Sequence, residues 1–169
     1  ILAHYQKINQ LSDEINSSPA ALSVISSAKK YIVEVEDSKY NAAAGRYNLG
    51  INQLSERNSL SAKNAYYNFE KAQYFYPNYK DVQSKLDEAY WAAVVKVVVQ
   101  PVLVNSNYYK LSNQYFQDQI DHFMANYQQN RFVIFYSEQQ AVKQKIVPNQ
   151  VLSLSFDDFV VGQTYVKER

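Results

Sequence analysis

Two histidines, His4 and His122, are the only imidazole groups in the chain. Asp118 precedes His122 by four residues in a segment with helical periodicity, so the two side chains would project from one helix face and could ligate a metal ion. No third ligand lies nearby in the sequence, and such a pair is common on polar helix faces. We therefore interpret Asp118 and His122 as part of a solvated surface.

A second acidic pair, Asp157 and Asp158, lies between Phe156 and Phe159. Paired carboxylates could bind a cation or perform acid–base chemistry. Adjacent residues of a strand point to opposite faces, so the two groups could share one site only at a bulge. We favour a charged loop or edge strand, where the charges would limit aggregation.

The residue types that most catalytic sites need are scarce. The chain has no Cys, which excludes disulfides, thiol catalysis and zinc sites of the Cys type. Its three Gly cannot build a phosphate-binding loop, and no recognisable nucleophile motif joins Ser or Thr to His and Asp. We predict a protein that is not an enzyme, with no catalytic residue, cofactor or metal. An enzyme with its site near His122 and Asp157 is the least favoured alternative.

The length and composition predict a folded protein of one medium or two small domains, because 47% of the 169 residues are hydrophobic. The net charge of +1, without a continuous basic stripe, gives no support for nucleic-acid binding. No apolar run is long enough for a transmembrane segment. Because the sequence begins at Ile1, we expect any signal peptide or lipid-bearing Cys to lie upstream, and we expect the natural chain to continue past Arg169.

The first half of the chain has the periodicity of successive amphipathic helices. We predict helices over residues 2–16, 19–35 and 38–55, the first with one apolar face formed by Leu2, Tyr5, Ile8, Leu11 and Ile15. Residues 32–35 alternate β-branched side chains and could instead form a strand. A further helix over 59–76 ends before Pro77, and Asn78 is the expected N-cap of a helix over 79–93.

The helices around Gly50 carry a recognisable spacing. A Leu–Gly pair is followed by Ala, an aromatic residue, Ala and Pro, here Leu49, Gly50, Ala65, Phe69, Ala72 and Pro77. This pattern resembles a tetratricopeptide repeat. Arg46 stands at the family's large early residue, and the longer interval between Gly50 and Ala65 predicts an insertion in the turn near residues 55–59. The alternative is an ordinary antiparallel helical pair.

The resemblance implies a concave groove that holds partner peptides. It would place five partner-binding residues there: Tyr47, Ile51, Asp81, Ser84 and Glu88. Leu54 and Trp91 would line the same groove or lie in the core. Aromatic anchors beside polar groups suit peptide capture.

The composition changes at Ala93, where a Val-rich run begins. We predict a buried strand over 94–104 with Pro101 at an end or bulge, a turn at 105–107 and a helix over 109–129. Strands over 132–136, 151–156 and 159–166 and a helical turn over 138–142 follow. The predicted fold class is therefore α+β, with tetratricopeptide-repeat-like helical hairpins over 1–93 and a small α/β domain over 94–169.

The second half resembles the envelope lipoprotein domains of curli-type secretion, which share a Val-rich strand ending in Pro, an amphipathic helix and further strands. Together with the missing Cys and the abundant Tyr and Asn, this resemblance implies a bacterial periplasmic or outer-membrane location. We predict a non-catalytic protein–protein interaction scaffold, a subunit or lipoprotein of a cell-envelope assembly. The alternative is a structural subunit of an outer-membrane or secretion complex that oligomerises through its α/β half.

Overall fold

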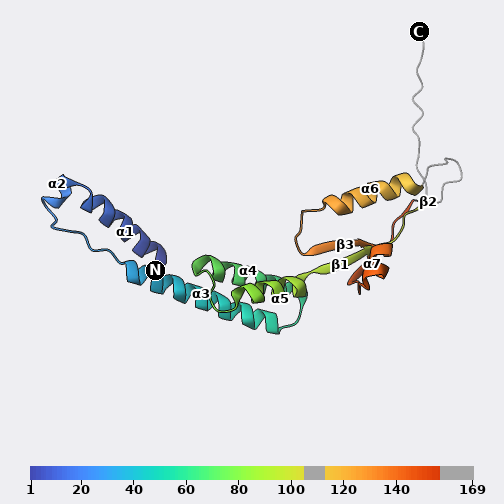
Figure 1. Cartoon of the computed structure of the whole chain (residues 1–169), viewed down its shortest axis with the longest axis horizontal. Coiled ribbons are helices and arrows are strands. Elements are labelled where there is room, and N and C mark those ends of the chain that lie inside the picture. Colours follow the sequence, from blue (N-terminus) through green and yellow to red (C-terminus); the bar gives the residue numbers. More distant parts are fainter. Residues whose placement is uncertain (105–112, 157–169) are drawn as a thin grey trace, which may run out of the picture. The chain divides into compact units, whose positions relative to one another are not determined.

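The chain forms helices followed by a small parallel sheet, so the predicted α+β class is confirmed. The computed structural model describes residues 1–104 and 113–156 (Figure 1). It divides into two compact units, Ile1–Ala93 and Val94–Arg169. The described residues exclude the predicted turn at 105–107, the start of the helix over 109–129, Asp157, Asp158 and the strand over 159–166.

The first helix agrees with the prediction and the second does not. Helix α1 spans Leu2–Asn16, but α2 spans only Pro19–Leu22. The prediction of a helix over 19–35 is therefore wrong. So is the alternative of a strand over 32–35, because Ile32 begins the long helix α3.

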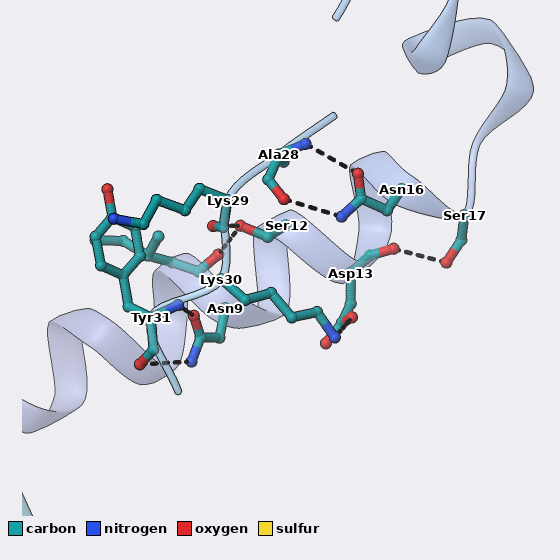
Figure 2. Close-up of polar contacts among 10 residues, drawn as sticks. Asn9, Ser12, Asp13, Asn16, Ser17, Ala28, Lys29, Lys30 and Tyr31 are labelled. Carbon is teal, nitrogen blue, oxygen red and sulfur yellow. Dashed lines mark hydrogen bonds and ion pairs between the residues drawn. The ribbon is translucent and has the colours of Figure 1, made fainter. Parts of the chain in front are cut away.

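The residues between α2 and α3 find hydrogen-bond partners on α1 rather than in a helix of their own. Ala28 and Tyr31 each use their backbone N–H and C=O groups to pair with an Asn side chain of α1 (Figure 2). Buried or half-buried backbone groups need such partners. The backbone N–H and C=O groups of Ala28 and Tyr31 therefore have hydrogen-bond partners although residues 28–31 are not helical.

Helices α3 and α4 form an antiparallel hairpin. Helix α3 spans Ile32–Ser55 and α4 spans Ser59–Phe75, so only three residues connect them. The connection contains Arg57 at a φ of 55°, and the side chain of Asn58 accepts a hydrogen bond from the Ser61 N–H at 2.8 Å. This bond caps α4.

Helix α5 spans Val82–Ala93 and begins three residues later than predicted. Asn78 is not its N-cap, because Asn78 has a φ of 61° and lies inside the turn that follows Pro77. The helical hydrogen bonds begin at Asp81, whose carbonyl accepts from the Lys85 N–H at 3.0 Å. Asn78 and Lys80 have left-handed backbone conformations, so α5 can begin only after them.

The core of the first unit lies between α3, α4 and α5. Phe69 is fully buried, with the buried Ala65 and Ala72 four residues before it and three after it. Gly50 of α3 lies against the Phe69 ring, so closely that an added Cβ would stand 2.7 Å from a ring carbon. The absence of a side chain at Gly50 allows the two helices to approach. The other buried members are Ala43, Tyr47, Tyr79, Val82, Leu86 and Ala89.

The second unit contains five short strands and two helices in its described part. The strands are β1 (Val95–Val99), β2 (Leu103–Val104), β3 (Val133–Ser137), β4 (Gln150–Leu152) and β5 (Ser155–Phe156). The helices are α6 (Asn113–Asn126) and α7 (Glu138–Gln144). The strand predicted over 94–104 is broken near Pro101, and the one over 151–156 is also split in two. The predicted helical turn over 138–142 is confirmed as α7.

The main sheet is parallel, with β1 between β3 and β4. The residues Val97, Val98 and Val99 of β1 are buried, as a central strand with covered faces requires. A second, two-stranded parallel sheet joins β2 to β5. Ser137 ends β3 and caps α7, because it exchanges side-chain and backbone hydrogen bonds with Gln140.

Candidate functional site

The first unit carries a groove of about 550 Å³ where α3 ends, α4 begins and α5 passes. Its lining has an apolar part and a polar, charged part, which we call the rim. The apolar part is formed by Ile51, Leu54, Ala62 and Ala92, and the rim by Ser55, Arg57, Asn58, Ser59, Lys85 and Glu88. We call this the α3–α5 groove.

The α3–α4 connection brings the groove's rim into position. Ser59, the first residue of α4, donates a hydrogen bond from its hydroxyl to the Ala93 carbonyl at 2.8 Å and so joins the start of α4 to the end of α5. The Ser61 hydroxyl donates to the Glu56 carboxylate within the same turn. These bonds fix the turn that carries Arg57.

The rim has charges of both signs. The Lys85 ammonium lies 2.7 Å from the Glu88 carboxylate, one turn later on α5. This hydrogen bond raises the pKa of Lys85 above its usual value. Arg57 adds an exposed cation from the turn.

The five predicted partner-binding residues do not all lie together. Ile51 and Glu88 line the α3–α5 groove, while Ser84 is exposed on α5 without lining it. Tyr47 is buried, and its hydroxyl donates to the Asp81 carboxylate at 2.5 Å.

The contact between Tyr47 and Asp81 joins α3 to the start of α5. The hydrogen bond to Asp81, together with burial, raises the pKa of Tyr47 to about 12. The same bond lowers the pKa of Asp81 below its usual value. The Lys80 ammonium lies 5.0 Å from the centre of the Tyr47 ring and 5.3 Å from that of Tyr79, within cation–π range. In this structure the Tyr47 hydroxyl therefore bonds within the first unit.

The two residues predicted for either groove or core differ in position. Leu54 does both, because it lines the groove and packs against the core cluster. Trp91 does neither, since it is 59% exposed and does not line the groove.

Sequence reasoning missed a polar network between α3 and α4. The buried Asn68 accepts a hydrogen bond from Arg46 at 3.1 Å and donates one to the Gln53 side chain at 2.8 Å. The available signal was the position of Asn68, which shares a helical stripe with Ala65 and Ala72. A polar residue on a core stripe indicates a buried partner.

The histidines form no metal centre with the residues that the structure describes. His122 is exposed on α6 beside Asn126, and the Asp118 carboxylate accepts from Gln114 at 2.7 Å. His4 is exposed on α1. Across residues 1–104 and 113–156, no group of three or more His, Cys, Asp or Glu could hold a metal ion.

Comparison with models of protein families, with curated protein sequences and with solved structures finds no match to this chain. Within the described parts, no helix is both long enough and apolar enough to cross a bilayer.

Proposed function

We propose that this protein is a non-catalytic protein–protein interaction scaffold that binds partner segments in the α3–α5 groove. The observation that carries the proposal is the groove itself, with its apolar lining residues and charged rim. Apolar lining residues supply affinity by burying partner side chains, and a charged rim selects among partners. The volume of about 550 Å³ suits a few side chains of a peptide.

The helix arrangement supports a repeat of the tetratricopeptide type. A three-residue turn joins two antiparallel helices, a third helix packs on the second, and Gly50 lies against the Phe69 ring. Repeats of this type stack each helical hairpin on the next, and the stacked helices form concave binding surfaces. Of the residues that carry the resemblance, Ala65, Phe69 and Ala72 lie on α4, and Pro77 lies in the turn between α4 and α5.

The assembly that we propose is a bacterial cell-envelope complex, of which this chain is a subunit or a lipoprotein in the periplasm or at the outer membrane. The support is compositional: there is no Cys, and Tyr and Asn are abundant. The Val-rich strand that ends near Pro101 and the helix that follows it add the likeness to curli-type lipoproteins.

A second candidate is a structural subunit that oligomerises through the second unit. Large apolar side chains are exposed there on α6 and β4, including Tyr115 at 59%, Phe123 at 53% and Val151 at 56%. Such exposure is typical of interaction surfaces. A mass that rises with protein concentration, and that falls again when Phe123 and Val151 are changed to Ser, would favour this candidate.

The decisive experiment is a crosslinked pull-down from cells of the source organism with the native chain and a groove variant. The variant Arg57→Glu/Glu88→Arg reverses two exposed rim charges and leaves the buried core unchanged. We expect a small set of partners to be lost, because like charges would then oppose each other across the contact.

The matched control is Lys71→Glu/Asp87→Arg, which makes the same two charge reversals at exposed positions outside the groove. Partners lost in the groove variant and kept in the control would support the proposal. Partners kept in both variants would move the contact away from the groove.

A further inference from the structure

Side chains of helix α1 form hydrogen bonds with the backbone of the extended residues 28–31 (Figure 2). The side-chain carbonyl of Asn9 accepts from the Tyr31 N–H at 2.6 Å, and its NH2 group donates to the Tyr31 carbonyl at 3.3 Å. Asn16 does the same with Ala28, at 2.9 and 3.0 Å. Between them, the Ser12 hydroxyl donates to the Lys29 carbonyl at 2.8 Å.

The spacing of the two Asn residues matches the repeat of an extended chain. Seven residues of α-helix separate Asn9 from Asn16, a rise of about 10.5 Å. Three residues of extended chain separate Ala28 from Tyr31, a rise of about 10 Å. Residues 28–31 run antiparallel to α1. Each Asn side-chain amide therefore meets both the N–H and the C=O group of one residue. This fit depends on geometry and not on the side chains of the bound residues.

Side-chain contacts add a preference for certain residues. The Lys30 ammonium forms an ion pair with Asp13 of α1. The Tyr31 ring lies 5.6 Å from the Tyr5 ring, centre to centre, and the Lys29 ammonium lies 4.7 Å from the centre of the Tyr31 ring. The face therefore accepts a short segment in which Lys precedes an aromatic residue.

The segment can leave α1 without opening the core of the first unit. None of Ala28, Lys29, Lys30 and Tyr31 is buried, and none belongs to the core cluster of α3, α4 and α5. The preceding residues, 23–27, are all exposed. A second segment with the same contacts can therefore replace the first.

We propose that the face of α1 formed by Asn9, Ser12, Asp13 and Asn16 is a binding site for an extended partner peptide containing Lys followed by an aromatic residue. Residues 28–31 of the chain occupy this site and act as an internal competitor. The site is separate from the α3–α5 groove, so the failure of one proposal leaves the other standing.

The test uses the full chain and a fluorescein-labelled peptide of residues 26–33, followed by fluorescence polarisation. In the variant Ala28→Pro/Lys30→Glu, the internal segment loses one N–H donor and its ion pair, while α1 is unchanged. We expect this opened variant to bind the peptide about tenfold more tightly than the native chain, because the internal competitor is weakened.

In the opened variant, adding Asn9→Ala/Asn16→Ala should weaken binding by about tenfold or more, since four hydrogen bonds are lost. Ala favours helix over Asn, and circular dichroism would verify that α1 stays folded. The matched control Lys7→Ala/Gln10→Ala removes polar side chains of α1 that contact each other instead of the segment. It should leave binding unchanged.

Peptides with one amide replaced by an ester separate backbone recognition from side-chain packing. An ester at the Tyr31 amide removes the donor to Asn9 and should weaken binding. An ester at the Ser27 amide changes only the Ser27 N–H and the Ser26 carbonyl, which take no part in these hydrogen bonds, and should leave binding unchanged. The proposal is overturned if the opened variant does not bind the peptide, or if the Asn substitutions leave binding unchanged. It is also overturned if the native chain forms a dimer that Asn9→Ala/Asn16→Ala abolishes, because the occupant would then be a second copy.

Discussion

Gly50 is the residue at which a single methyl group has the clearest consequence. In Gly50→Ala the new Cβ would stand 2.7 Å from the Phe69 ring, and the ring is fully buried and cannot move away freely. Overpacking of this kind costs about 1–3 kcal/mol, which outweighs the gain of up to about 1 kcal/mol in helix propensity. We expect the free energy of unfolding, measured with urea, to fall.

Gly45 provides the matched control on the same helix. A Cβ at Gly45 would meet no atom within 4 Å, so Gly45→Ala should raise the free energy of unfolding by up to about 1 kcal/mol. Opposite signs for the two substitutions are the expected result. Equal effects would show that α3 and α4 do not approach at Gly50.

Tyr47 gives the first unit a dependence on alkaline pH. In the unfolded chain its hydroxyl would lose a proton near the ordinary pKa of 10.0, whereas in the folded chain it keeps the proton until about pH 12. Its contribution to stability is therefore complete below pH 10 and is lost as the pH rises through about 12.

Tyr47→Phe removes this contribution. We expect the free energy of unfolding at neutral pH to fall by about 0.5–1.5 kcal/mol, the usual worth of one hydrogen bond. The difference between the native chain and the variant should narrow as the pH rises from 10 to about 12. Tyr74→Phe, at a tyrosine that is 82% exposed, should leave the free energy of unfolding unchanged.

At the scale of elements, the buried polar network fixes how α3 and α4 meet. Asn68→Ala would leave the Arg46 guanidinium and the Gln53 carbonyl without the partner that they have in the hairpin. We expect a loss of about 1–3 kcal/mol in the free energy of unfolding. Asn64→Ala, at an exposed position one turn earlier, should have little effect. Similar losses in the free energy of unfolding for Asn68→Ala and Asn64→Ala would mean that the hydrogen bonds of Asn68 do not stabilise the hairpin.

Sequence reasoning worked where an element's limits are set by its own residues. Pro77 predicted the end of helix α4, and this signal is local. The helix predicted over 19–35 failed because residues 28–31 bond to Asn9 and Asn16, which periodicity cannot register. Hydrogen bonds to α1 therefore outweighed the local helical preference of residues 28–31.

The groove shows the same division. Ile51 of α3 and Glu88 of α5 were expected there, because the resemblance to a tetratricopeptide repeat implies a groove lined by their two helices. Arg57 was missed, because it reaches the groove from a turn whose left-handed conformation no local pattern indicated. Tyr47 and Asp81 were expected at the partner surface, but their side chains meet each other instead.

At the scale of the whole molecule, the division after Ala93 predicts that the first unit folds by itself. Its core cluster, polar network and groove all come from residues 1–93. We expect a fragment of these residues to unfold cooperatively in urea, and Gly50→Ala to lower its midpoint as in the full chain. A gradual transition that Gly50→Ala does not shift would contradict this expectation.

The central position of β1 bears on how the protein is made. A ribosome completes β1 before either of its neighbours, since β3 and β4 both come later in the sequence. For that interval the nascent chain carries a Val-rich strand with two open edges, and such strands pair readily with other chains. Translation that stalls between Val99 and Val133 would therefore release an aggregation-prone product, and a chaperone that covers this strand would help the second unit to form.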